Sequence, residues 1–255
     1  MPLTVVTIPC LSDNYTFLLH DSISNETAVI DVPDAGPIKQ ELDDRGWRLT
    51  QIWLTHHHWD HVDGLPDLLR SHPAQVIGAR DDADRLPALD AKVGNGDTFT
   101  FAGNDVQVMD VSGHTIGHIA FHVPAAKAAF TADSLMALGC GRLFEGTPAQ
   151  MFDSLSKLAA LPDDTVVFSG HEYTAANATF AITIDPDNPD LIARIADITE
   201  KRAKGQPTVP SSLQLERATN PFLRGHDPQI QTELNMKGAA PVDVFTEIRA
   251  RKDRF

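Results

Sequence analysis

The feature that most constrains this chain is residues 55–61, which read Thr-His-His-His-Trp-Asp-His. The apolar residues 52–54 before it predict the end of a buried strand, and residues 62–69 after it predict a loop that opens a helix. Imidazole nitrogens and carboxylate oxygens are the ligands that zinc-like metal ions take in proteins. The sequence therefore predicts an α/β fold in which one strand delivers a metal-binding cluster at its carboxyl end.

Side-chain alternation divides this cluster. If the strand continues into it, His56 and His58 point to one side and can hold one ion, whereas His57 points to the other side. We interpret His57 as a supporting or packed residue. Asp60 and His61 follow as the chain turns, so they can face a second ion. The alternative interpretation is a solvated histidine-rich loop, which the preceding buried strand disfavours.

Three further candidate ligands, His114, Asp133 and His171, each come just after another predicted strand. In α/β proteins the sheet brings such strand-end residues together. The expected ligand sets are His56, His58 and His114 for one ion and Asp60, His61 and His171 for the other. The two oxygens of Asp133 can bridge both ions, and such a site keeps room for a shared water.

Two other polar residues are expected to lie near this site. His118 starts a predicted strand and can support a ligand through a hydrogen bond. Asn14 follows a predicted turn and is a weaker candidate. The remaining histidines are interpreted as ordinary structural or exposed residues: His20, His72, His122 and His226.

Composition excludes several classes of partner. The net charge of −14 argues against nucleic acid, which requires a basic face. No apolar run approaches the ~20 residues that cross a bilayer, so we expect no membrane segment. The start of the chain lacks the pattern of a signal peptide. Cys10 and Cys140 are the only cysteines, too few for a disulfide framework, and we expect a cytoplasmic protein in which both are small buried residues.

The predicted secondary structure changes near Tyr173. Before it, short strand patterns dominate, with a hairpin turn expected at residues 94–97. After it, helices are expected to start at Pro189, Pro228 and Pro241. We therefore predict two domains, an α/β metal-binding catalytic domain over residues 1–173 and a small helical substrate-binding domain over residues 174–255.

The motifs resemble a known superfamily. The pattern Thr55-His56-x-His58-x-Asp60-His61, together with the sequences around the other three ligand candidates, is the signature of the metallo-β-lactamase fold. A second set of motifs, at residues 12–15, 139–147, 220–224 and 249–255, resembles glyoxalase II, the hydroxyacylglutathione hydrolases, in its bacterial branch. This resemblance covers essentially the whole chain. It implies a four-layer αββα sandwich with a small C-terminal all-helical domain.

The resemblance also implies an activity. Glyoxalase II hydrolyses S-D-lactoylglutathione to D-lactate and glutathione, the second step of methylglyoxal detoxification. Two divalent metal ions per subunit are implied, with zinc as the first choice and iron or manganese as alternatives, and Asp60 would orient the attacking water. The alternatives are another hydrolase of this fold, such as a lactonase, a β-lactamase or a general thioesterase, or a non-catalytic metal-binding protein.

Substrate-binding residues follow from the same resemblance. Arg142 and Tyr173 would contact the glutathione backbone, and Arg249 and Lys252 would bind its glycine carboxylate. Some members of the family have tyrosine where this chain has Phe144, so one hydrogen bond to the substrate is in question. We expect a monomer.

Overall fold

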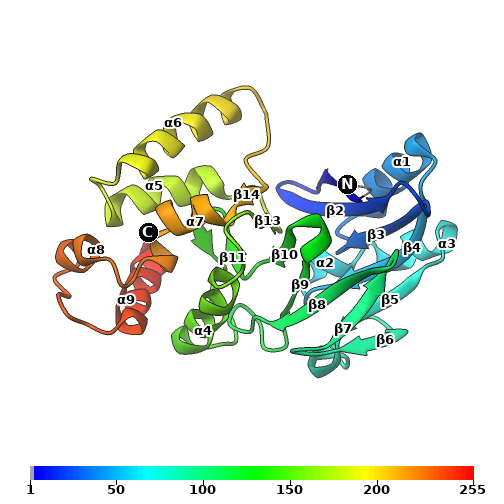
Figure 1. Ribbon diagram of the computed structural model, residues 1–255, viewed down its shortest axis with the longest axis horizontal. Helices are drawn as coiled ribbons and strands as arrows, with labels where there is room; N and C mark the ends of the chain where they lie inside the picture. The colour runs from blue at the N-terminus through cyan, green and yellow to red at the C-terminus, as the bar shows by residue number, and fades with distance from the viewer. Residues whose placement is uncertain (1–2) are drawn as a thin grey trace. The chain divides into compact units, whose positions relative to one another are not determined.

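The computed structural model describes residues 3–255 (Figure 1). The chain forms two compact units, and each unit contains two separate segments of the sequence. The first unit runs to Asp110 and resumes over Gly117–Thr131. The second contains Val111–Ile116 and Ala132–Phe255. The predicted division at Tyr173 stays a prediction.

A six-stranded sheet in the order β1-β2-β3-β4-β5-β6 dominates the first unit. Its strands are β1 Leu3–Cys10, β2 Asn14–Asp21, β3 Glu26–Ile30, β4 Arg48–Leu54, β5 Gln75–Ala79 and β6 Ala91–Val93. Pairing is antiparallel from β1 to β3 and parallel from β3 to β6. Parallel neighbours place their carboxyl ends at the same edge, so the residues that follow β3 and β4 lie side by side.

The first unit also holds part of a second sheet, in the order β10-β9-β8-β7. These strands are β7 Thr98–Phe101, β8 Asn104–Asp110, β9 Ile119–Val123 and β10 Ala128–Ala132. The helices are α1 Ala35–Arg45, α2 Trp59–Val62 and α3 Leu65–Ser71, with 3₁₀ turns at Arg80–Asp82 and Pro124–Ala126. Helix α1 packs against α3 and β1.

Aromatic rings join the two sheets of this unit. Trp53 of β4 is fully buried. Its ring centroid lies 5.3 to 6.2 Å from those of four phenylalanines on β7, β9 and β10, namely Phe99, Phe101, Phe121 and Phe130. Large aromatic side chains contribute most to such an interior because each removes a large apolar area from water.

The prediction of a hairpin turn at residues 94–97 is wrong. These residues connect β6 of the first sheet to β7 of the second, so they pass between sheets. The two-residue hairpin of this region joins β7 to β8 through Ala102 and Gly103, both with positive φ (47° and 76°). Alanine is rarely found at such a position, and the sequence therefore carried no signal for this turn.

The second unit is mainly helical. Its elements are β11 Leu135–Met136, β12 Gly139–Cys140, α4 Pro148–Ala159, β13 Val166–Ser169, α5 Thr174–Ile184, α6 Pro189–Ala203, β14 Ser211–Ser212, α7 Leu213–Thr219, the 3₁₀ turn η3 Pro221–Leu223, α8 Pro228–Glu233 and α9 Pro241–Arg254. The predicted helices α6, α8 and α9 are confirmed. Helices α5 and α7 were missed. After Tyr173 the only strand within the described residues is the two-residue β14, which pairs with β13.

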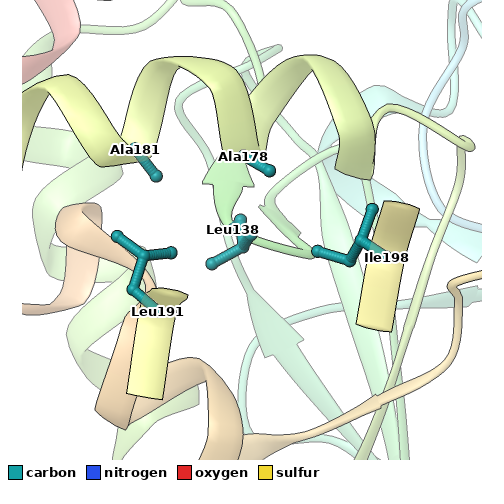
Figure 2. Close-up of a cluster of buried hydrophobic side chains, with 5 residues drawn as sticks. All are labelled: Leu138, Ala178, Ala181, Leu191 and Ile198. Carbon is teal, nitrogen blue, oxygen red and sulfur yellow. The ribbon is translucent and has the colours of Figure 1, made fainter. Parts of the chain in front are cut away.

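A small apolar cluster stabilises this unit. Leu138, at the tip of the β11–β12 hairpin, packs among buried side chains of α5 and α6 (Figure 2). These are Ala178, Ala181, Leu191 and Ile198. The hairpin tip is therefore part of the core of the helical region. Within residues 3–255, no helix combines the length and the apolar character required to cross a membrane.

Trp53→Ala should lower the free energy of unfolding by about 3–5 kcal/mol, because it leaves a cavity between the two sheets. Urea denaturation measures this loss. Ile23 provides the control, since its side chain is largely exposed to solvent. Ile23→Ala should change stability by less than about 0.5 kcal/mol, as is usual for surface substitutions. Equal effects of the two substitutions would contradict the packing described for Trp53.

Candidate metal centre

The histidine cluster begins just past the end of β4. The strand stops at Leu54 and His58 precedes the first residue of α2, so the prediction that the cluster lies where a strand ends and a helix begins is confirmed. The condition for strict side-chain alternation, a strand that continues into the cluster, is not met. His56 and His58 nevertheless share one side, with Nε2 of His56 3.2 Å from Nδ1 of His58. Ring nitrogens that approach this closely are suitably placed to share one cation.

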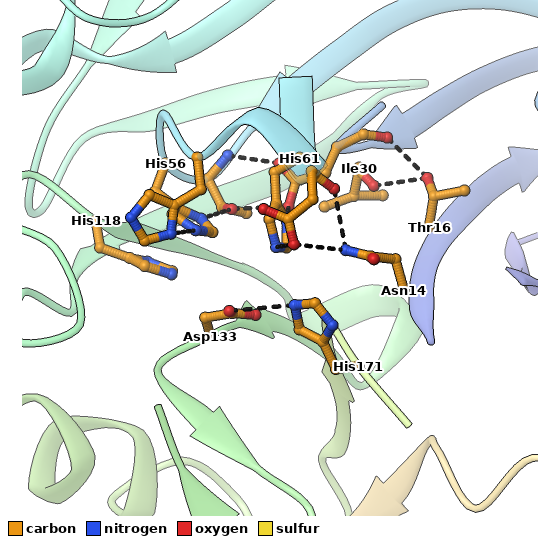
Figure 3. A network of polar contacts seen from close by, with 12 residues as sticks. Asn14, Thr16, Ile30, His56, His61, His118, Asp133 and His171 are labelled. Carbon is orange, nitrogen blue, oxygen red and sulfur yellow. Dashed lines mark hydrogen bonds and ion pairs between the residues drawn. The ribbon is translucent and has the colours of Figure 1, made fainter. Parts of the chain in front are cut away.

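Asp31, directly after β3, organises the cluster. One carboxylate oxygen accepts from the backbone N–H of Thr55, and the other lies 2.8 Å from both the Thr55 hydroxyl and Nδ1 of His61. Figure 3 shows His61 and the polar contacts around it. A carboxylate on Nδ1 keeps the proton there, which leaves the lone pair of Nε2 for a metal ion.

Sequence reasoning missed Asp31. Its side chain could itself join His56 and His61 around an ion, since the three offer ligand atoms within 4.8 Å of one another. Both of its oxygens, however, already bind Thr55 and His61, and we assign it a supporting role. The only available signal was an acidic residue at the end of a strand that parallels β4.

His56 is supported on two sides. Its Nδ1 lies 3.0 Å from the Thr55 hydroxyl, and its ring stacks on that of His118 with centroids 4.6 Å apart. Both histidines are completely buried. His118 thus contacts a candidate ligand by ring stacking, while its Nδ1 contacts the carbonyl of Ile119 at 3.2 Å. Its predicted support of a ligand through a hydrogen bond stays a prediction.

Asn14 fixes the orientation of Asp60. Its side-chain amide donates to the backbone carbonyl and to Oδ2 of Asp60, both at 3.0 Å. The same Oδ2 lies 3.9 Å from Nε2 of His61, so Asp60 and His61 face a common position. The expectation that Asn14 lies near the site is confirmed.

The backbone around α2 is held by close contacts to the loop after β3. Val32 donates to the carbonyl of His61 at 2.7 Å, and Gly64 donates to the carbonyl of Val32 at 2.9 Å. A Cβ on Gly64 would lie 2.8 Å from the backbone nitrogen of Ala35. Only glycine allows the chain to approach this closely, and the approach sets the position of His61.

The second unit brings together the other three predicted ligands. Oδ2 of Asp133 lies 3.4 Å from Nε2 of His114 and 3.3 Å from Nε2 of His171. The Asp133–His171 contact is visible in Figure 3. Nδ1 of His114 donates to the backbone carbonyl of Arg142 at 2.8 Å. Its Nε2 is therefore again the ligand atom. Asp133 lies between one histidine from each predicted ligand set.

His57 and the two cysteines were not predicted to be metal ligands. Nδ1 of His57 lies 2.9 Å from Oδ2 of Asp82, which is buried. The interpretation of His57 as a supporting or packed residue stays a prediction. Cys10 and Cys140 are buried free thiols, as expected. Burial raises the pKa of Cys10 to about 12 and also raises the pKa of Cys140. Thiols that stay protonated are poor metal ligands.

The predicted substrate residues at the end of α9 are buried or partly buried. Arg249 is only 5% exposed, and its guanidinium donates to the carbonyl of Cys140 at 3.1 Å and to Asp253 at 2.8 Å. Nζ of Lys252 donates to the carbonyl of Ala176 at 3.3 Å. Burial lowers the pKa of Lys252, and the nearby charge of Arg249 lowers it further.

The other two substrate candidates lie on the surface. The Arg142 side chain is 61% exposed, and its Nε is 3.8 Å from Asp253. Tyr173 is 41% exposed and stacks on the ring of His171 with centroids 4.6 Å apart. Phe144 occupies the position at which some members of the family have tyrosine. It is exposed, and its ring centroid lies 5.3 Å from that of His114.

Comparison with known proteins gives consistent matches. Residues 14–171 match the model of the metallo-beta-lactamase superfamily, and residues 172–255 match that of the hydroxyacylglutathione hydrolase C-terminus. The chain is 65% identical to a hydroxyacylglutathione hydrolase of Ruegeria pomeroyi and 64% identical to one of Roseobacter denitrificans, over 100% of each chain in both pairs. A crystal structure of ETHE1 from Myxococcus xanthus has a similar fold, with a TM-score of 0.66, 24% identity and coverage of 99% of this chain and 98% of that one.

The donor chemistry fits these matches. The histidine and aspartate clusters of this metallo-β-lactamase fold are suited to a pair of divalent metal ions. Each of three ligand histidines, His56, His61 and His114, has a polar partner on Nδ1 and directs its Nε2 elsewhere. This is the usual arrangement of metal-ligating imidazoles.

His58→Ala should lose metal, whereas His57→Ala should retain most of it, because only His58 directs a ring nitrogen toward His56. Metal analysis of the two purified variants after dialysis measures the difference. Equal loss of metal from both would show that His56 and His58 do not act as a pair.

Asp31→Asn should weaken metal binding by about tenfold or more, because the amide offers one acceptor oxygen where the carboxylate offers two, so Thr55 and His61 cannot both keep their contacts. Competition with a chelator measures the affinity. Asp34→Asn is a matched control, since Asp34 caps α1 through the N–H of Gly36 and lies outside the ligand set. Unchanged affinity in Asp31→Asn would remove Asp31 from the supporting role.

Proposed function

The chain belongs to the hydroxyacylglutathione hydrolases of the metallo-β-lactamase superfamily, and we propose that it hydrolyses S-D-lactoylglutathione and related 2-hydroxyacyl-glutathione thioesters. The products are glutathione and the hydroxy acid, D-lactate in the first case, which corresponds to the second step of methylglyoxal detoxification. The observation that carries this proposal is the combination of a complete set of metal-ligand candidates with full-length identity of 65% to a curated member of the family.

The proposed ligand assignment keeps the two sets predicted from the sequence. The first ion takes His56, His58 and His114, and the second takes Asp60, His61 and His171. Asp133 would supply an oxygen to each ion, and its position between His114 and His171 supports this role. We propose zinc for both ions, because nitrogen-rich ligand sets of this kind suit it, with iron or manganese as alternatives.

The chemistry then requires little more than correct positioning. When bound, two divalent ions would acidify a water molecule at neutral pH and polarise the thioester carbonyl. Asp60 accepts a hydrogen bond from the attacking water and so directs its lone pair at the carbonyl carbon. Asn14 holds Oδ2 of Asp60 at 3.0 Å and thereby limits the freedom of this carboxylate.

The leaving group explains why no separate general acid is needed. A thiol has a pKa of about 8.5, so the glutathione sulfur departs as a thiolate without prior protonation. The titratable groups that contact Asp133 include His114 and His171, both proposed as ligands and so committed to the metal ions. A thioester is thus a substrate that this set of residues can cleave.

Substrate binding is proposed to use the cationic end of α9. Lys252 and Arg249 would attract the glycine carboxylate of the glutathione part, and Arg142 and Tyr173 would contact its backbone. The chain has a net charge of −14. Such a surface repels an anionic peptide, which therefore requires a local cationic site. Arg249 is largely occupied by Cys140 and Asp253, which makes Lys252 the more informative residue to test.

The remaining assignments are also proposals. We propose a monomer, since one chain supplies all seven ligand candidates. We propose a cytoplasmic location, because both cysteines are free thiols, as is usual in a reducing compartment.

The purified protein loaded with zinc should hydrolyse S-D-lactoylglutathione, and removal of the metal should abolish the reaction. Asp133→Ala should lose activity and bind fewer than two ions, because the proposed bridge between two like charges is gone. Preferential turnover of a lactone or a β-lactam would favour another hydrolase of this fold. Metal binding without any turnover would favour a non-catalytic metal-binding protein.

Lys252→Ala should raise KM for glutathione thioesters by about tenfold, equivalent to ~1.4 kcal/mol, and leave the rate on a neutral thioester unchanged. Arg251→Ala is the matched control, because it removes the same charge from the same helix at a side chain paired with Glu247. Equal losses in the two variants, or on the two substrates, would remove Lys252 from substrate binding.

A further inference from the structure

The β11–β12 hairpin connects two parts of the candidate metal centre in the second unit. Asp133 lies two residues before β11, and Arg142 lies two residues after β12. The hairpin pairs Leu135 with Cys140, and Gly141 donates to the carbonyl of Ser134 at 3.1 Å, so its two ends stay together.

These ends also form a closed ring of contacts. The carbonyl of Arg142 accepts from Nδ1 of His114 at 2.8 Å, and Nε2 of the same histidine lies 3.4 Å from Asp133. A Cβ on Gly141 would lie 2.0 Å from the carbonyl oxygen of Asp133 and 2.9 Å from Nδ1 of His114. The ring is therefore so tight that a small displacement of the hairpin would move both ligand candidates.

Three buried side chains hold the other end of the hairpin. The carboxylate of Glu216 on α7 accepts from the backbone N–H of Leu138 at 2.9 Å. Asn220 donates to the carbonyls at both ends of the turn, Met136 at 3.1 Å and Gly139 at 3.0 Å. Asn177 on α5 donates to another carbonyl of the turn, that of Ala137, at 3.0 Å.

The turn requires these partners. Leu138 has a positive φ of 56°. A residue with a large side chain rarely adopts this conformation without support from its surroundings. Its side chain is inserted among α5 and α6, as Figure 2 shows. The turn is thus fixed both by apolar packing and by hydrogen bonds to its backbone.

Glu216 is itself held rigidly. It is fully buried and forms an ion pair with Arg194 of α6, which also donates to the Thr219 hydroxyl at 2.6 Å. Ser211 donates to the same carboxylate at 2.6 Å. A buried carboxylate with this number of partners has one orientation, and it can therefore act as a fixed attachment point.

We propose that Asn177, Glu216 and Asn220 are positioning residues for metal binding, which act on Asp133 and His114 through the β11–β12 hairpin. Their role is to transmit the rigidity of the helical region to the ligands. The inference rests on the proposed metal-dependent function, but its main measurement, zinc affinity, does not depend on the substrate.

The test compares two asparagines of equal burial in the same unit. Asn177 and Asn188 are both 7% exposed, but Asn188 caps α6 and bonds to Asp185 and to the carbonyl of Ala218. Asn177→Ala should weaken zinc binding by about threefold or more in competition with a chelator, whereas Asn188→Ala should lower thermal stability and leave zinc affinity unchanged. Asn220→Ala, which removes two hairpin contacts, should weaken zinc binding by about tenfold or more.

Two further readouts separate positioning from simple loss of stability. Hydrogen exchange at the amides of Leu138 and Gly141 should accelerate in Asn177→Ala and not in Asn188→Ala. In zinc-saturated protein, Asn177→Ala should lower kcat for the thioester and leave KM nearly constant. Zinc affinity and exchange equal to those of Asn188→Ala would overturn the inference.

The experiments can contradict the proposed hydrolase activity without contradicting the positioning role. A wild-type protein that binds zinc but hydrolyses no thioester would overturn the hydrolase assignment, and the zinc affinities of the variants would still decide on the positioning role. If Asn220→Ala does not fold, the comparison of Asn177→Ala with Asn188→Ala remains sufficient.

Discussion

The carboxylate of Asp31 is the interaction on which the first half of the candidate centre depends. It joins the ends of two parallel strands, because it binds the backbone and hydroxyl of Thr55 after β4 while it sits after β3. It also sets the protonation of His61. A parallel pair of strands thus provides what a single loop could not, a fixed acceptor directly behind a ligand.

The second unit also provides a fixed acceptor behind a candidate ligand, but through the backbone. The carbonyl of Arg142 holds His114, and the β11–β12 hairpin that precedes Arg142 is attached to buried side chains of the helical region. The two units therefore support their ligands independently, one through sheet geometry and one through a clamped turn.

Much of the centre could be predicted from the sequence, because the ligand candidates are chemically distinctive. The different directions of the His57 and His58 rings agree with the expected alternation, although β4 ends before either of them. Asp31 could not be found in this way, since its role depends on pairing between β3 and β4. The buried α5 was missed because apolar residues surround it on all sides and give no single face, and the family resemblance supplied the substrate, which no spacing could provide.

Arg142 contacts His114 through its main-chain oxygen, so its side chain is not needed for that contact. Its carbonyl belongs to the backbone and is present whatever the side chain, whereas its guanidinium is exposed to solvent. If the guanidinium contacts glutathione as proposed, substitutions at this position would alter recognition of the glutathione part and leave the contact that holds the imidazole intact. Residue 142 is thus a position at which substrate preference could change without disturbance of a candidate metal ligand.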